Sequence, residues 1–232
     1  MYKVRKSDER GITKIDWLYG KHSFSFGHYY DEDNMGFGNL RVINEDEVKA
    51  GGGFATHPHK DMEIITYILD GALEHKDSLG TGSVIVPGDV QKMTAGTGIL
   101  HSEFNHSKEN PVHLLQIWIL PNKNGLSPSY QQKNFNHKRG NGKLILLVSE
   151  DGRDESITIN QDVNMYLLDL NAKDNFNHEI SQNRKIWIQI ARGAVNINNI
   201  DLFQGDGLTI EQEKLLDFVA ERDSEILIFD MK

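Results

Sequence analysis

Short apolar runs separated by turn residues alternate along most of the chain. Runs that predict strands occupy residues 23–27, 40–44, 64–69, 101–104 and 112–120. The run 64–69 ends at Asp70-Gly71, a dipeptide that favours a tight hairpin. Strands of this length at this spacing indicate an all-β sandwich or barrel.

The segment 121–143 interrupts this pattern because it is polar and carries clusters of glycine, proline and asparagine. Such a segment is typical of a linker or a long connection. The alternative is a structured arm that packs on one domain. The β pattern resumes with apolar runs at 144–149 and 165–170, so we expect two domains, at residues 1–135 and 136–232.

The second half repeats features of the first. Residues 66–78 and 187–199 share one order of features: an apolar strand, a turn glycine and a second strand. Pro87-Gly88-Asp89 has a counterpart in Gln204-Gly205-Asp206, and both halves end on an apolar strand. An internal repeat of a β unit explains this pattern. The second copy has no histidine near its Gly-Asp turn, so we expect it to be structural and metal-free.

Composition excludes several kinds of chemistry. The 232 residues include no cysteine, which rules out disulfides, cysteine-ligated zinc, iron–sulfur clusters and thiol nucleophiles. The net charge of −9 argues against binding nucleic acid through a basic patch. Residues 1–11 lack an apolar signal core, and no apolar run is long enough to span a bilayer. We therefore expect a cytoplasmic protein that binds neither membrane nor nucleic acid.

The candidate chemistry lies in two pairs of residues, His57 with His59 and His101 with Glu103. Each pair has the spacing i, i+2, and alternate residues of a strand point to the same face. Two adjacent strands could therefore direct both pairs at one ion. Three imidazoles and a carboxylate suit iron, nickel, copper, manganese or zinc. A lone histidine on a strand is more often a surface or hydrogen-bonded residue, but the two pairs together strengthen the metal hypothesis.

The sequence around these pairs resembles a known family. The first cupin motif is similar to the pattern formed by Gly51, His57, His59, Glu63 and Gly71. The second cupin motif is similar to the pattern formed by Gly88, Thr94, Ala95, Gly96, His101 and Asn105. The second pattern departs from the usual motif at two points. Thr94 stands where proline is common, and four residues instead of two separate Gly96 from His101. These departures, and residues 56–71, 94–105, 114–122 and 128–132, resemble bacterial pirin-like proteins of the quercetin 2,3-dioxygenase type. The resemblance covers almost the whole chain.

The resemblance implies a bicupin, that is, two jelly-roll-like β-barrel domains with a metal only in the N-terminal one. It implies His57, His59, His101 and Glu103 as the metal ligands. Ordinary cupins take their carboxylate ligand from the position of Glu63, and by parity both glutamates are expected to face the barrel interior. Glu63 is six residues from His57, roughly 20 Å along an extended strand, whereas Glu103 is two residues from His101. We therefore expect Glu103 to be the ligand and keep Glu63 in reserve.

The resemblance also implies an activity, the cleavage of a flavonol such as quercetin by O2 with release of carbon monoxide. The 3-hydroxyl of the substrate would bind the metal and pass its proton to Glu103 as general base. Iron(II) is the expected metal, with nickel, copper, cobalt, manganese and zinc as alternatives. Candidates for an apolar pocket lining, or simply for the core, are Phe24, Phe26, Phe54, Met62 and Phe104.

Other functions stay open at this point. The main alternative is a non-catalytic, redox-responsive regulator that contains the metal and acts through protein partners. A sugar-phosphate isomerase or hydrolytic cupin comes next, and a storage cupin last. Among the remaining histidines, His113 is a candidate partner of a ligand, although an ordinary hydrogen-bonded role is favoured. No role is assigned to His22, His28 and His75.

Overall fold

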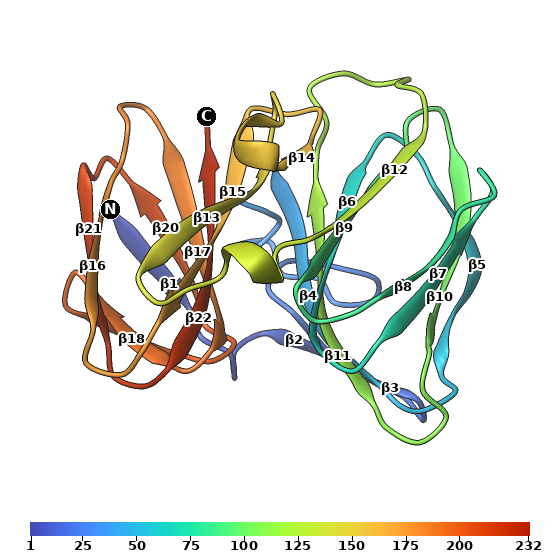
Figure 1. The fold of residues 1–232 in the computed structure, drawn as a ribbon, viewed down its shortest axis with the longest axis horizontal. Coiled ribbons are helices and arrows are strands. Elements are labelled where there is room, and N and C mark those ends of the chain that lie inside the picture. The colour runs from blue at the N-terminus through green and yellow to red at the C-terminus, as the bar shows by residue number, and fades with distance from the viewer. The chain divides into compact units, whose positions relative to one another are not determined.

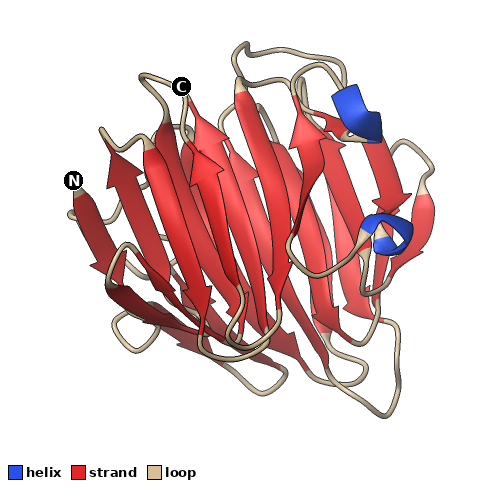
Figure 2. Cartoon of the chain, turned by 60° about the vertical axis from the view of Figure 1, so that its left-hand side comes forward, coloured by secondary structure: helices blue, strands red, loops and turns tan.

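The computed structural model describes all 232 residues and divides into two compact units. The N-terminal unit consists of Gly11–Asn136 and Ile159–Gln161, and the C-terminal unit of Met1–Arg10, His137–Thr158 and Asp162–Lys232. Both units are built from strands, and the only helices are two 3-10 turns, η1 (Asn136–Lys138) and η2 (Arg153–Glu155) (Figure 2). None of the helices has the length and apolar character needed to cross a membrane.

The N-terminal unit contains a seven-stranded and a four-stranded sheet (Figure 1). The larger sheet has the order β12 (Ser129–Asn134), β9 (Asp89–Thr94), β6 (Glu63–Asp70), β11 (Val112–Ile119), β4 (Leu40–Val48), β3 (Leu18–His22) and β2 (Gly11–Lys14). The smaller sheet has the order β5 (Gly53–His59), β10 (Ile99–Asn105), β7 (Leu73–Asp77) and β8 (Gly82–Ile85). The strands predicted at 40–44, 64–69, 101–104 and 112–120 are all present.

The C-terminal unit repeats this plan. Its larger sheet has the order β1 (Tyr2–Arg5), β20 (Gly207–Glu211), β17 (Lys185–Arg192), β22 (Ser224–Met231), β15 (Val163–Leu170), β13 (Lys143–Ser149) and β14 (Ile157–Thr158). Its smaller sheet has the order β16 (Asn175–Glu179), β21 (Leu215–Ala220), β18 (Ala194–Ile197) and β19 (Ile200–Phe203). The strand orders therefore contain the repeat predicted from the sequence, and the all-β expectation is confirmed.

Two edge strands depart from simple chain order. Strand β1 pairs with β20, so Met1–Arg10 belongs to the C-terminal unit although we expected it in the N-terminal domain. Strand β12 lies inside the polar segment 121–143 and pairs with β9, so the part of this segment up to Asn136 is a structured arm of the N-terminal unit, and the part from His137 onward belongs to the C-terminal unit. Thus β1 and β12 occupy corresponding edges of the two larger sheets.

Two local predictions are wrong. Residues 23–27 form no strand, because β3 ends at His22 and Phe26 makes only an isolated bridge to Tyr29 across a turn that contains Gly27. Asp70-Gly71 makes no hairpin, because β6 and β7 belong to different sheets and the chain turns a corner between them. Gly71 has a φ of 80°, and a Cβ there would lie 2.7 Å from the carbonyl oxygen of Pro111. This corner therefore favours glycine.

The two units differ in what lies between their sheets. The core of the C-terminal unit is apolar and joins Ile188 on β17, Val195 on β18 and Phe218 on β21. In the N-terminal unit the apolar core is split into smaller clusters, and buried polar side chains lie among them. Because polar groups are buried at a free-energy cost unless they are paired, this polar interior indicates a functional site.

Candidate metal centre

Strands β5 and β10 bring the predicted histidines together. They pair antiparallel, with His57 opposite His101 and His59 opposite Ile99. Because residues two apart on a strand share a face, His57 and His59 both point toward His101. The Nε2 atoms of His57 and His101 lie 3.0 Å apart. Two nitrogens bound at right angles to one ion at about 2.1 Å would have a separation of about 3 Å, so this spacing suits a shared ion.

Three imidazoles form a compact donor group, which we call the outer triad: His57, His59 and His101. One ring nitrogen from each lies within 4.8 Å of those of the other two. The Nδ1 atom of His57 donates a hydrogen bond of 2.8 Å to the carbonyl oxygen of Ala55. Because the proton is then on Nδ1, the lone pair of His57 is on Nε2, which faces His101. The chemistry of this donor set fits a divalent transition metal.

The surroundings of His59 and His101 favour neutral rings. Burial and, to a smaller extent, the neighbouring His57 and His75 together lower the pKa of His101 to about 3, against an opposing effect of Asp77. Burial likewise lowers the pKa of His59 to about 4, with His101 and His57 contributing. Both rings are therefore unprotonated at neutral pH, and each keeps a lone pair that can bind a cation.

Glu103 lies next to the outer triad but does not join all three of its imidazoles within 4.8 Å. Its carboxylate accepts a hydrogen bond of 2.8 Å from Nε2 of Gln116 and one of 3.4 Å from the hydroxyl of Thr66. Within 4.8 Å it groups instead with His101 and His75. The four predicted residues thus lie on the paired strands β5 and β10, and the carboxylate of Glu103 is buried.

Glu63 lies elsewhere. It is three residues before Thr66 on β6, and an odd spacing on a strand places the two side chains on opposite faces. Its carboxylate accepts hydrogen bonds from Thr94 at 3.1 Å and Asn160 at 3.0 Å, and lies 3.6 Å from Nζ of Lys92. The expectation that Glu63 faces the barrel interior is wrong, because the corner between β5 and β6 breaks the parity.

Aromatic rings surround the outer triad. Trp118 on β11 packs edge-on against His59 at 4.9 Å between centroids, and Phe26 packs on Trp118 at 5.4 Å. Phe54 lies 6.4 Å from His57. Of the other predicted lining residues, Met62 packs on a core cluster, Phe24 is buried, and Phe104 is exposed. Phe26 and Phe54 are therefore the predicted residues nearest the site.

A cavity of about 590 Å³ opens beside His59. Its lining consists of Pro58, His59, Lys60, Ser78, Gly98, Ile99 and Leu100. Binding sites for small molecules have volumes of this order. The outer triad is therefore reached from a space large enough for a small organic molecule.

Sequence reasoning missed several residues of the site. His75 was given no role, yet its ring lies 5.3 Å from that of His101, and it groups with His101 and Glu103. The signal was present, since His75 and Asp77 repeat the i, i+2 spacing of the two recognised pairs. Gln116, Thr66 and Trp118 carried no such signal. His113 lies 3.0 Å from Glu45 and makes no contact with the site, which agrees with the ordinary role favoured for it.

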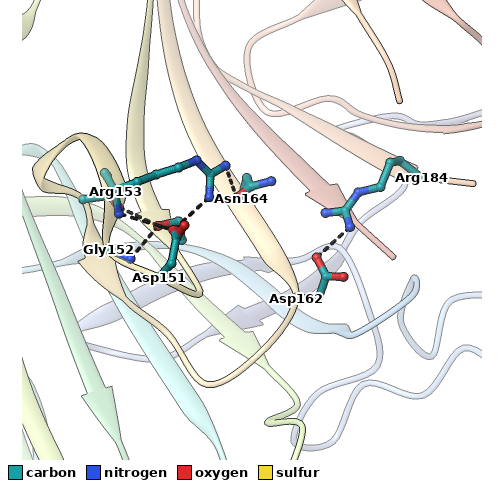
Figure 3. A network of polar contacts seen from close by, with 8 residues as sticks. Asp151, Gly152, Arg153, Asp162, Asn164 and Arg184 are labelled. Atoms are coloured by element: carbon teal, nitrogen blue, oxygen red, sulfur yellow. Dashed lines mark hydrogen bonds and ion pairs between the residues drawn. The ribbon is translucent and has the colours of Figure 1, made fainter. Parts of the chain in front are cut away.

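The C-terminal unit has polar contacts but no comparable donor group. Around η2, Arg153 donates hydrogen bonds to Asp151 at 2.9 Å and Asn164 at 2.7 Å, and Arg184 bonds Asp162 at 2.6 Å (Figure 3). A cavity of about 420 Å³ in this unit contains no histidine in its lining. The histidine cluster of the chain is therefore confined to the N-terminal unit, as predicted.

Fold and site together define a metal-binding bicupin. Residues 3–119 match the family model described as Pirin, and residues 146–231 match the one described as Quercetinase C-terminal cupin domain. The chain belongs to the pirin family. The resemblance and the bicupin architecture inferred from the sequence are thereby confirmed.

Relatives match over the full length. The chain is 46% identical over 231 residues to quercetin 2,3-dioxygenase of Escherichia coli (strain K12), covering 100% of this chain and 99% of the relative. It is 40% identical over 235 residues to a putative quercetin 2,3-dioxygenase of Pasteurella multocida (strain Pm70), covering 100% of both. The expected resemblance to quercetin 2,3-dioxygenase oxidoreductases is confirmed by these relatives.

Solved structures of related proteins have the same fold. The crystal structure of YhhW from Escherichia coli has a TM-score of 0.96 and 45% identity, covering 100% of this chain and 98% of that one. The structure of bacterial pirin YhhW in complex with nickel(II) has a TM-score of 0.95 and 45% identity, covering 100% and 99%. The nickel complex and the histidine cluster together support a divalent-metal site in this family member.

Proposed function

We propose that this chain is a metal-dependent dioxygenase that opens a flavonol such as quercetin with O2. The proposed ligands are His57, His59, His101 and Glu103. The observation that carries the proposal is the convergence of three imidazoles within 4.8 Å of one another, beside a cavity of about 590 Å³. The names of the relatives supply the substrate class.

The metal identity is part of the proposal. Iron(II) is our first choice, and the nickel complex of the related pirin makes nickel the main alternative. Imidazole and carboxylate ligands bind both ions, so the supply of metal in the cell contributes to the outcome. We also propose that the protein works in the cytoplasm, as expected from the sequence.

When bound, the metal supplies Lewis acidity, which lowers the pKa of a coordinated substrate hydroxyl. The chain's own residues then act on the substrate. Glu103 accepts the proton of the 3-hydroxyl, because its carboxylate lies within 4.8 Å of a ring nitrogen of His101, which belongs to the outer triad. Gln116 and Thr66 hold this carboxylate in place through their hydrogen bonds.

The walls around the site orient the substrate and exclude water. Trp118, packed on His59 and supported by Phe26, offers an apolar aromatic surface to a planar substrate. His57 is held in orientation by its bond to the carbonyl oxygen of Ala55. Ring opening consumes one O2 and releases carbon monoxide.

The test is oxygen uptake with quercetin by iron-loaded and nickel-loaded protein, beside a His101→Ala variant. We expect uptake tied to quercetin loss in the wild type and none in the variant. If the wild type binds metal but takes up no oxygen above the metal-free background, the dioxygenase proposal is wrong. The regulatory function acting through protein partners would then become the better candidate.

A further inference from the structure

His75 is a fourth imidazole at the centre of the N-terminal unit. It lies on β7 opposite Glu103 in register and is 0% exposed. Its Nε2 atom lies 3.1 Å from a carboxylate oxygen of Asp77, whose side chain is also fully buried. Its Nδ1 atom is buried and has no hydrogen-bond partner. A carboxylate is one of the usual partners of the second ring nitrogen of a metal-binding histidine.

The tautomer of His75 follows from this contact. Asp77 accepts the hydrogen bond, so the proton of a neutral His75 is on Nε2 and its lone pair is on Nδ1. A buried polar atom without a partner destabilises a fold, and such atoms often mark a place where an ion or water binds. The Nδ1 atom of His101 is a second buried nitrogen of this kind, and the two rings lie 5.3 Å apart.

We propose that His75, His101 and Glu103 form a second, inner position for a divalent cation, which shares His101 with the outer triad. One donor atom from each of the three residues lies within 4.8 Å of the others, and all three side chains are at most 2% exposed. Two imidazole nitrogens and one carboxylate oxygen are donors that suit a first-row divalent ion. This inference rests on the proposed metal binding and adds a location to it.

The shared ligand limits how the two positions are filled. A neutral imidazole has one lone pair, so His101 binds one ion at a time. The chain therefore holds one ion, which lies either in the outer triad beside the cavity or in the inner position beside His75. Tyr130 covers the far side of His75 at 5.0 Å between rings, and its hydroxyl is already bonded to Ser83 and Gln132, so it adds no ligand.

The experiment uses cobalt(II) alone as the probe, with binding followed by calorimetry and by the visible absorption of the bound ion. The full chain carrying His57→Ala and His59→Ala lacks two of the three imidazoles of the outer triad but keeps the inner set. We expect this double variant to bind one cobalt(II) per chain. Adding His75→Phe should weaken that binding by about tenfold or more, since a ligand is lost. Adding His106→Phe, at an exposed histidine, is the matched control and should leave it unchanged.

A second variant tests the position without removing the imidazole. In Asp77→Asn the new amide can donate to Nε2 of His75, which moves the ring proton to Nδ1 and removes its lone pair. The side-chain oxygen at position 77 can still accept the bonds from the backbone amides of Leu79 and Thr81, so the turn is retained. Asp77→Asn in the double variant should therefore weaken cobalt(II) binding as His75→Phe does.

The outcomes separate this inference from the proposed function. If the wild type binds no cobalt(II), both fail. If the wild type binds it but the double variant does not, the inner position is absent and the outer site stands. Residual binding in the double variant that is unaffected by both His75→Phe and Asp77→Asn also overturns the inference. Circular dichroism identifies any variant that has not folded, and Asp77→Asn then decides alone.

Discussion

Gln116 on β11 donates a hydrogen bond of 2.8 Å to the carboxylate of Glu103 on β10, a strand of the opposite sheet. Gln116 is itself fixed, because its amide oxygen accepts a bond of 3.2 Å from the indole of Trp118. One amide thus connects the carboxylate to the aromatic wall on His59. The position of Glu103 therefore depends on a residue outside the predicted ligand set.

Gln116→Met should weaken metal binding while the fold is retained. Loss of the amide frees the carboxylate of Glu103, and loss of a group that orients a ligand lowers metal affinity by about 10–100-fold. Competition with a chelator measures this affinity. Gln189→Met, at a buried glutamine of the C-terminal unit, is the matched control and should leave the affinity unchanged. Equal effects of the two substitutions would show that Gln116 acts only on stability.

Glu103→Gln should reduce turnover more than metal retention. The amide keeps an oxygen that can bind an ion but cannot accept the substrate proton, and a general base contributes about 10²–10⁴-fold to rate. Quercetin turnover and metal content, measured on the same preparation, separate the two effects. Parallel losses of both would remove the base role of Glu103 and leave it as a ligand only.

Glu63→Gln should leave metal content unchanged and lower stability. Glu63 lies 3.6 Å from Nζ of Lys92, which is 2% exposed, so neutralising the carboxylate leaves a buried ammonium without its counter-charge. Breaking such a buried pair destabilises a protein by about 3 kcal/mol or more. Urea unfolding and metal analysis measure the two quantities. If Glu63→Gln lost its metal, Glu63 would again be a candidate residue of the metal site.

Metal binding should protect β5 and β10 from amide hydrogen exchange. An ion that binds only the folded state stabilises it by about 2.7 kcal/mol at a hundred times its dissociation constant. Exchange should therefore slow in these two strands when nickel(II) is added to metal-free protein. The corresponding strands β16 and β21 of the C-terminal unit are the internal control and should not change. Equal protection in both units would argue against a site confined to the first.

The stability of the folded chain should decrease as the pH is lowered, and His178 should contribute to this decrease. Burial lowers the pKa of this histidine below its usual value of 6.5 in the folded chain, against a smaller opposing effect of Asp230. Below pH 6.5, His178 binds a proton more readily in the unfolded chain than in the folded chain. The contribution of His178 to stability is therefore present above pH 6.5 and is lost as the pH falls. When urea unfolding is measured between pH 8 and 5, the free energy of unfolding should depend less steeply on pH in His178→Gln than in the wild type. Identical slopes would exclude His178 as the cause.

Alternation along the strands predicted the most important part of the site. His57 and His59, and likewise His101 and Glu103, share faces because each pair lies on one uninterrupted strand. The alternation of side chains between two faces does not continue across a corner between strands. For this reason the orientation predicted for Glu63 was wrong, and no role was assigned to His75. Both residues follow a turn at which the chain passes from one sheet to the other. The pattern within a strand is local, whereas the path between sheets depends on tertiary packing.

The pattern of apolar and polar residues also could not reveal the edge strands of the fold. Strand β12 is polar and half-exposed, so its sequence resembles a loop until its pairing with β9 is known. The pairing of β1 with β20 joins residues at opposite ends of the chain, which no local signal reports. The support of Glu103 by Gln116 was equally hidden, because one buried glutamine in an apolar strand has no distinctive spacing.

The pairing of β1 with β20 has a consequence for biosynthesis. Lys3 precedes its hydrogen-bond partner Thr209 by 206 positions. The N-terminal unit has all its strands once β12 has left the ribosome, whereas β1, which precedes them, must wait until β20 has been made. Domains generally fold as units during synthesis. Strand β1 is therefore translated long before its partner β20, and until then its exposed edge is open to pairing with another nascent chain.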